Sequence, residues 1–155
     1  MRRTLCLFLG LVLLISAFSA CSSGQPKDVD LDDAAAALLK DVSFEDELTQ
    51  AKTDMALLLY GLTQDEVAQA VVYVGTGAFA DEFSLWKATS ADAAASIEKK
   101  VQARVDALKE SYADYKPQEV PKLESPVVIT SGNYVALCVS PDAETAEKTL
   151  KEFFK

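Results

Sequence analysis

The chain of 155 residues contains no histidine. This absence excludes histidine as the base that activates a serine or cysteine nucleophile and as a metal ligand, and with it the commonest hydrolase chemistries. Positive charge is also in short supply, because 24 Asp and Glu outweigh 15 Lys and Arg and give a net charge of −9. An acidic surface is repelled by nucleic acid and by anionic lipid headgroups, so we expect no nucleic-acid partner.

Cysteine is scarce too, with three in the chain, and the position of Cys21 is informative. Arg2 and Arg3 precede an uncharged, leucine-rich run over residues 4–20, which is the pattern of an export signal. The run ends in "FSAC", which resembles the bacterial lipobox with phenylalanine where leucine is usual. This resemblance implies cleavage between Ala20 and Cys21 and a diacylglyceryl group, with fatty acids such as palmitate, on the Cys21 sulfur.

The alternative to a cleaved signal is a transmembrane helix. Residues 4–20 would span roughly 25 Å as a helix, slightly less than a hydrocarbon core of about 30 Å, and this alternative leaves Cys21 unexplained. Two acyl chains suffice as a membrane tether. Either interpretation places the remaining chain on the extracytoplasmic side of the cell membrane. Cys6 leaves with the signal, so Cys138 has no disulfide partner.

Composition divides the chain into three parts. We expect a signal peptide over residues 1–20, a small, polar, flexible tether over residues 21–30, and one globular domain over residues 31–155. Loss of the signal with its two arginines moves the net charge from −9 to −11. The 135 residues from Cys21 onward suffice for one domain with a core and are too few for two.

Apolar periodicity and capping residues predict the helices. The patterns favour helices over residues 31–42, from Thr53 as N-cap to Gly61, from Ser90 as N-cap to residue 112, and from Ser140 as N-cap with Pro141 at the first helical position. A capping box formed by Thr63 and Glu66 predicts one further short helical turn.

Alternation and turn residues predict four strands, over residues 70–75, 81–88, 127–130 and 133–140. Helix is an open alternative for residues 81–88, because Phe79, Phe83 and Trp86 also fit a helical stripe. The three prolines within residues 114–126 favour an irregular loop there.

The order strand, glycine turn, strand, capping serine and helix occurs twice, so the sequence predicts two β-β-α units. Two hairpins joined in one four-stranded antiparallel sheet, with both long helices on one face and additional N-terminal helices, would make an α+β fold.

Both faces of this sheet are expected to be apolar. We expect one set of side chains to meet the two long helices, namely Phe83, Leu85, Val135, Leu137 and Val139, and a second set to face away, namely Trp86, Tyr134, Ala136 and Cys138. Two hypotheses follow for the second face. Either the N-terminal helices cover it, or it is a partly open aromatic surface around Trp86, Tyr134 and Tyr73 that binds a peptide, a glycan or a partner protein.

One set of motifs is similar to that of penicillin-recognising enzymes. "SIEK" at Ser96–Lys99, "SGN" at Ser131–Asn133 and "KTL" at Lys148–Leu150 resemble S-x-x-K, S-x-N and K-T-G. The third motif lacks its glycine and falls on a predicted helix, and the domain is too small for the two-part body of that fold. A cell-envelope serine hydrolase using Ser96 and Lys99 is therefore a lesser alternative.

Three further patterns have simpler explanations. "GTGAFA" fits a dinucleotide fingerprint but needs a helix after it, and a hairpin loop explains its glycines better. "DVDLDD" resembles a calcium loop but has Asp33 where glycine is required. Asp81 and Glu82 are adjacent on a predicted strand and so point to opposite faces, which excludes a converging acid and base pair and favours an ordinary role as edge charges.

Several stretches resemble a group of small bacterial lipoproteins that share a domain of unknown function. They are "LLYGL", "VVYVGTGAFADEFSLWKA", "YADYKPQE" and "GNYVALCVS", and the resemblance runs from about Leu31 to the C-terminus. It implies a fold and an extracytoplasmic address. It assigns no activity to the matching residues Ala80, Asp81 and Glu82.

These observations together predict a lipid-anchored extracytoplasmic protein that is not an enzyme and acts as an interaction or accessory module. We expect no catalytic residues, no cofactor and no metal, and we expect an envelope protein, peptide or glycan as partner. A small solute-binding lipoprotein is the main alternative, and it would require a closed pocket between the sheet and the N-terminal helices.

Overall fold

A computed structural model describes residues 28–154 of the chain. The predicted signal peptide 1–20, Cys21 and most of the predicted tether 21–30 lie outside the described residues. The described elements are, in chain order, α1 (Leu31–Asp41), β1 (Thr49–Gln50), α2 (Thr53–Tyr60), β2 (Val67–Val74), β3 (Glu82–Ala88), α3 (Ala91–Tyr115), a 3₁₀ turn (Pro117–Glu119), α4 (Val120–Glu124), β4 (Val127–Ser131), β5 (Tyr134–Val139) and α5 (Ala143–Phe154).

The strands form one antiparallel sheet in the order β1-β2-β3-β5-β4. The two predicted hairpins, β2–β3 and β4–β5, are joined through β3 and β5, and Gly132 takes the positive φ of 56° that the second turn requires. The sheet has five strands and not the predicted four. The fifth, β1, is a two-residue pairing of Thr49 with Val74 and of Gln50 with Tyr73, which is too short to leave a periodic pattern.

Local capping explains where the helices begin. Asp30 accepts hydrogen bonds from the backbone N–H groups of Asp32 and Asp33 at the start of α1, and Ser90 accepts one from Ala93 at the start of α3. The apolar periodicity that predicts α3 has its cause in the core: Ala94, Ile97, Val101, Val105 and Tyr112 are buried, and Leu108, at the same spacing, is half-buried. The helix alternative for residues 81–88 is wrong, because these residues form β3 between two partner strands.

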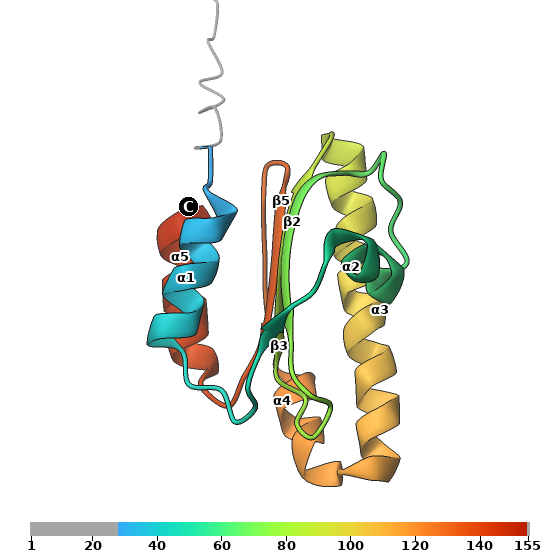
Figure 1. Ribbon diagram of the computed structural model, residues 1–155, viewed down its shortest axis with the longest axis vertical. Helices are drawn as coiled ribbons and strands as arrows, with labels where there is room; N and C mark the ends of the chain where they lie inside the picture. The colour runs from blue at the N-terminus through green and yellow to red at the C-terminus, as the bar shows by residue number, and fades with distance from the viewer. Residues whose placement is uncertain (1–27, 155) are drawn as a thin grey trace, which may run out of the picture.

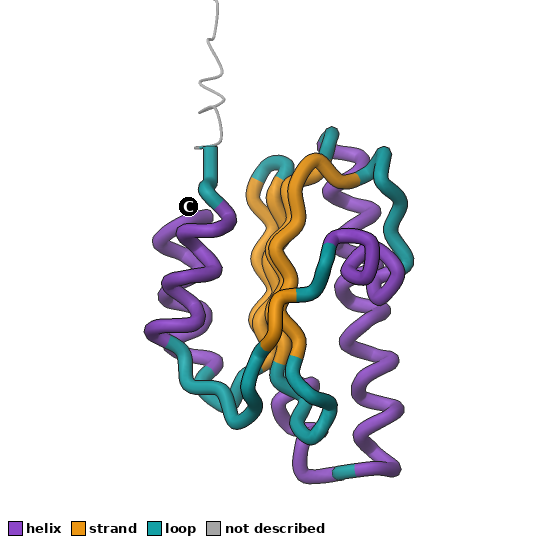
Figure 2. The backbone as a smooth tube through the Cα atoms, viewed as in Figure 1, coloured by secondary structure: helices purple, strands orange, loops and turns teal. Residues whose placement is uncertain are grey.

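Helices cover both faces of the sheet, as Figures 1 and 2 show. α1 and α5 lie on one face, and α2 and α3 lie on the other. The prediction that both long helices share one face is therefore wrong. At about 1.5 Å per residue, the 25 residues of α3 extend roughly 37 Å along one face, which α3 covers together with α2, and the second apolar face is buried by α5 together with α1.

The cross-strand register decides which side chains share a face. Phe83 lies opposite Cys138 and Leu85 opposite Ala136, whereas Trp86 lies opposite Val135. The core against α1 and α5 thus contains Phe83, Leu85, Tyr134, Ala136 and Cys138, and the core against α2 and α3 contains Trp86, Val135, Leu137 and Val139. The predicted division placed Phe83 and Leu85 with the wrong partners on β5.

Three predicted segments differ in detail. Residues 114–126, expected as an irregular loop, contain the end of α3, a 3₁₀ turn and α4. Pro117 is the first residue of the 3₁₀ turn, and Pro121 is the second residue of α4. The capping box of Thr63 and Glu66 closes a turn and not a helix. α5 begins at Ala143, because Asp142 accepts from the N–H of Thr145 as the N-cap, whereas the predicted N-cap Ser140 accepts from the N–H of Asp142, before the helix.

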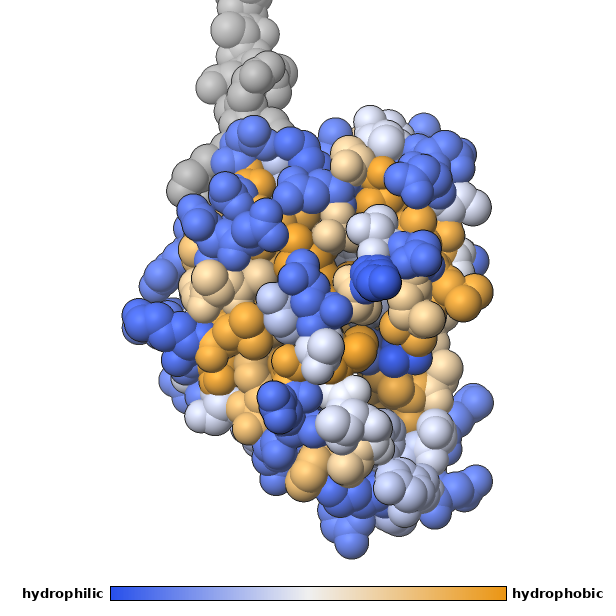
Figure 3. All heavy atoms as spheres, in the orientation of Figure 1, coloured by the Kyte–Doolittle hydropathy of each residue, from blue (hydrophilic) through white to orange (hydrophobic). Residues whose placement is uncertain are grey.

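The surface of the domain carries both hydrophobic and hydrophilic side chains. In the orientation of Figure 3, hydrophobic side chains lie over the central part of the molecule and hydrophilic ones dominate its outline. The large apolar side chains with the greatest exposure are Leu39 on α1, Tyr115 at the end of α3, and Met55 and Leu58, which are neighbours three residues apart on α2. Across residues 28–154, no helix combines the length and the apolar character needed to cross a membrane.

Candidate functional site

The three aromatic residues of the predicted binding face do not form one surface. Trp86 is fully buried against α2, where its ring meets Tyr60 edge-on at 4.9 Å between centroids. Tyr134 is 4% exposed and lies on the opposite face of the sheet. Tyr73 is half-buried on that same face and stacks on Phe83 at 4.8 Å. Both faces carry helices, so the structure places these rings in the two cores and not on an open aromatic surface.

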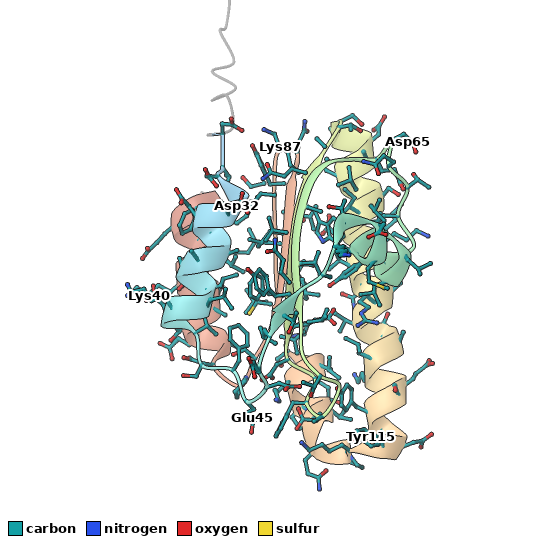
Figure 4. The ribbon with its side chains drawn as sticks, in the orientation of Figure 1. Asp32, Lys40, Glu45, Asp65, Lys87 and Tyr115 are labelled. Carbon is teal, nitrogen blue, oxygen red and sulfur yellow. The ribbon has the colours of Figure 1, made fainter. Side chains whose placement is uncertain are left out.

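Tyr134 instead holds the start of the domain to the sheet. Its hydroxyl donates to Asp28 Oδ1 at 2.5 Å and accepts from the backbone N–H of Val29 at 3.2 Å. Lys87 Nζ binds the same Asp28 oxygen at 2.7 Å, and these interactions lower the pKa of Asp28. We call Asp28, Val29, Lys87 and Tyr134 the N-terminal latch. Figure 4 shows Lys87 at one end of the sheet and Glu45 at the other.

The motifs that resemble those of penicillin-recognising enzymes are not assembled into one site. Ser96 and Lys99 lie on α3, whereas Lys148 lies on α5 across the sheet. The Ser96 hydroxyl donates to Glu66 Oε1 at 2.6 Å and so ties α3 to the turn before β2.

The other two short motifs are structural. "GTGAFA" is the loop between β2 and β3, so a strand follows it where a dinucleotide fold would need a helix. The Asp46 side chain packs closely against Gly75 in this loop. A Cβ at position 75 would lie 2.6 Å from Asp46 Oδ2, so a larger residue there would displace that side chain. "DVDLDD" is the entry into α1, where Asp30 is the N-cap.

Asp81 and Glu82 do point to opposite sides, but the expectation that they are edge charges is wrong. Their residues are 1% and 3% exposed, because β3 is a central strand. Glu82 pairs in a bidentate manner with Arg104 of α3, at 3.1 Å from Nε and 2.7 Å from Nη2. It also accepts from the Tyr60 hydroxyl at 2.8 Å, and burial together with the Glu82 charge holds the Tyr60 pKa well above its ordinary value.

A second buried ionic group surrounds Lys122 of α4. Its ammonium nitrogen lies 2.8 Å from Asp81 Oδ1, 2.7 Å from Glu119 Oε2 and 2.6 Å from Glu45 Oε2. The Asp81 side chain is fully buried, that of Glu119 is 4% exposed and that of Lys122 is 10% exposed. We call Glu45, Asp81, Glu119 and Lys122 the lysine cluster.

The lysine cluster also fixes neighbouring backbone. Asp81 Oδ2 accepts from the N–H groups of Glu45 and Asp46, and Glu119 Oε2 accepts from the N–H of Ala80 at 3.0 Å. Three segments are thereby joined: the link after α1, the loop before β3 and the helical turns after α3. Tyr112 of α3 also fixes the β2–β3 loop, because its hydroxyl donates to the carbonyl oxygens of Gly77 and Phe79.

Hydrogen bonds within the lysine cluster favour the charged forms of Glu119 and Lys122. Burial alone would raise the pKa of Glu119, but hydrogen bonds from Lys122, from the Ala80 backbone and from Lys116 outweigh it and hold the pKa below its ordinary value. Burial would likewise lower the pKa of Lys122, and the bonds to Asp81, Glu119 and Glu45 raise it instead.

Three carboxylates this close raise the question of a metal ion. Oxygen atoms of Glu45, Asp81 and Glu119 lie within 4.8 Å of one another, a donor set that suits a hard cation. The Lys122 ammonium already lies within 2.8 Å of all three carboxylates, so a metal would have to displace a buried cation. The arrangement fits an internal ion group that holds the fold together.

Sequence reasoning missed most of this site. The sequence predicts an irregular loop for Glu119 and Lys122, although Pro117 at the first position of the 3₁₀ turn and Pro121 at the second position of α4 signal the turns that bring these two residues together. Arg104 is a charged residue between the apolar positions of α3, where the helical pattern predicts exposure to solvent. No local signal in the sequence could have paired it with Glu82.

Cys138 is expected to be inert in the folded chain. Burial in the core beside α5 raises the pKa of its thiol to about 12, and the thiolate is the reactive form. Iodoacetamide at pH 8 should therefore modify Cys138 at least about a hundredfold more slowly than in 8 M urea, since the ionised fraction falls by about a thousandfold. Mass spectrometry of the peptide that contains Cys138 measures this ratio, and equal rates would contradict burial.

Comparison with known proteins gives one match. Residues 40–140 match the family described as Domain of unknown function (DUF4358), and the chain belongs to that family. No curated protein and no solved structure matches the chain significantly. The matched range includes β1 to β5 and the whole lysine cluster, and it ends at Ser140, before α5.

Proposed function

We propose that this DUF4358 protein is a lipid-anchored extracytoplasmic lipoprotein whose domain is a non-catalytic interaction or accessory module. The observation that carries the proposal is the position of Cys21, immediately after a basic, leucine-rich leader that ends in Ser19 and Ala20. Two acyl chains on the Cys21 sulfur would hold the protein at the membrane.

The non-catalytic part of the proposal is supported by the state of the ionisable groups that the fold brings together. In the lysine cluster, the carboxylates bind the Lys122 ammonium. Glu82 is engaged by Arg104 and by the Tyr60 hydroxyl. Groups that are buried and bonded to one another in this way stabilise a fold, whereas an acid or base in catalysis must reach a substrate.

The anchor is tested by the mass of the mature protein and by its partition between membrane and soluble fractions. We expect the wild-type chain to begin at Cys21, to carry a diacylglyceryl group and to sediment with membranes. The Cys21→Ser variant should keep its leader and lack the lipid mass. Cys6→Ser is the matched control, because Cys6 lies inside the leader and its loss should change neither result.

An intact leader and an unmodified Cys21 thiol in the wild-type protein would overturn the proposed anchor. Lipid that persists in the Cys21→Ser variant would also overturn it, because another group would then carry the modification.

A further inference from the structure

The sheet divides the interior of the domain into two cores. Among residues 28–154, one core lies between the sheet and α2 and α3, the other lies between the sheet and α1 and α5, and the two cores have no residue in common. α1 and α5 also pack against each other on their face of the sheet (Figure 1). We call these two helices the α1/α5 layer. Because the sheet separates the cores, loss of one core leaves the side-chain contacts of the other in place.

The α1/α5 layer consists of the first and the last helix of the described chain. Departure of both helices from the sheet would leave the chain from β1 to β5 uninterrupted. The match to the DUF4358 family coincides with this division. Its range, residues 40–140, contains every described strand together with α2, α3 and α4, but only residues 40 and 41 of α1 and none of α5. The sheet and its other helices thus form a continuous unit without the layer.

The two faces of the sheet are held to their helices by different kinds of contact. On one face, Glu82 of β3 binds both Arg104 of α3 and the hydroxyl of Tyr60 of α2. The α1/α5 layer meets the sheet through apolar side chains, the large buried ones being Leu31, Leu38, Leu150 and Phe154. Opening of the α2 and α3 face would have to break the bonds to Glu82, whereas opening of the α1/α5 layer leaves them intact.

The two helices of the layer are also short. α1 has 11 residues and α5 has 12, and isolated helices shorter than about 12–15 residues are marginal in water. Each helix is therefore stabilised by its contacts with the other and with the sheet, so loss of one should release the other. The N-terminal latch adds little to this attachment, because the Asp28 side chain is 83% exposed and exposed ion pairs contribute little to stability.

We propose that the α1/α5 layer opens as one unit while the strands, α2 and α3 stay folded, and so uncovers an apolar face of the sheet. Proteins open in contiguous cooperative units whose free energies of opening can lie below that of global unfolding. The uncovered face would present Phe83, Leu85 and Ala136, which are fully buried in the closed domain. This conformational device goes beyond the proposed function, and it depends neither on the lipid nor on the absence of catalysis.

Amide hydrogen exchange of the full wild-type chain in uncharged detergent tests the opening without any substitution. We expect the amides of α1 and α5 to share one opening equilibrium. After correction for intrinsic rates, they should exchange at least about tenfold faster than the amides of residues 97–105 in α3, which should exchange on global unfolding. Equal protection of the three helices, or opening of α1 and α5 at different equilibria, would overturn the proposal.

The Cys138 thiol is a second reporter, because it is buried on the face that the α1/α5 layer covers. The measurement is its rate of modification by iodoacetamide at pH 8 in two variants, Leu150→Ala and Ile97→Ala. Each variant removes a fully buried aliphatic side chain, Leu150 from the layer and Ile97 from the other core, so both should lose similar stability in urea.

The two variants should differ in their effect on Cys138. Leu150→Ala should speed its modification at least about tenfold, because it weakens the closed layer. Ile97→Ala should speed it about twofold or less, because the contacts of Ile97 are the same whether the layer is closed or open. Equal acceleration in both variants would overturn the proposal, since Cys138 would then become accessible only when the whole domain unfolds. Circular dichroism checks that each variant is folded, and amide exchange of the wild-type chain decides if one is not.

Discussion

Lys122→Met is expected to lower the free energy of unfolding by about 3–5 kcal/mol at pH 7. The variant keeps the aliphatic volume of the side chain and removes the one ammonium that contacts Asp81, Glu119 and Glu45. Asp81 and Glu119 are almost fully buried. Without Lys122, Asp81 would lose its ammonium partner, and Glu119 would keep Lys116, whose nitrogen lies 3.3 Å from Glu119 Oε1. Urea unfolding of the full chain in detergent, followed by far-UV circular dichroism, measures the change.

The pH dependence separates loss of charge from loss of packing. In the wild-type protein the pKa of Glu119 is lowered, so its contribution is complete above the ordinary value of 4.5 and is lost as pH falls through the lowered pKa. In Lys122→Met, Glu119 loses the hydrogen bond that contributes most to lowering its pKa, so that pKa rises, and protonation of Glu119 relieves its repulsion with Asp81 as pH falls. The difference between variant and wild type should therefore shrink from pH 7 towards pH 4.

Lys109→Met is the control for this change. Lys109 lies on the surface of α3, 42% exposed, and its nitrogen is 3.7 Å from a carboxylate oxygen of Glu124. Exposed pairs of this kind contribute about 0–1 kcal/mol, so the control should stay near wild type. A loss below about 1 kcal/mol in Lys122→Met would contradict the structural role of the lysine cluster.

Trp86→Ala is expected to cost about 3–5 kcal/mol and to lower the melting temperature by roughly 10–20 °C. The side chain is fully buried between β3 and α2, and truncation would leave a large cavity against Tyr60. Its Nε1–H has no hydrogen-bond partner among the described residues, so Trp86→Phe removes that cost and should destabilise less than the alanine variant. Circular dichroism on heating measures both.

Tyr115→Ala provides the comparison for an exposed aromatic residue. Its residue is 68% exposed at the end of α3, so truncation should change stability by about 0.5 kcal/mol or less. If Trp86→Ala behaved like this control, Trp86 would belong to an open surface and the assignment of the α2 and α3 core would be wrong.

The sequence predicts the long elements well because each has a local cause. The stripe of α3 and its Ser90 cap, the stop at Gly61 and the turn at Gly132 all act within a few residues of the chain. The structure confirms the two β-β-α units and the antiparallel sheet that these local signals predict. β1 is not predicted, because a strand of two residues is too short to show an alternating pattern.

The features that the sequence does not predict are contacts between residues far apart in the chain. Side chains in a strand alternate, so a shift of one residue between β3 and β5 moves every partner to the other face, and nothing local fixes that register. The candidate site has the same origin. Asp81 and Lys122 are 41 residues apart, and Glu82 and Arg104 are 22 apart, so their pairing depends on how α3 and α4 return to the sheet.

The N-terminal latch has a mechanical consequence. Lys87 and Tyr134 are cross-strand partners on β3 and β5, and both hold Asp28. Tension applied along the chain at residue 28 would therefore pass first into the two innermost strands and only then into α1. A force on the domain would act on two hydrogen-bonded strands before it acts on α1.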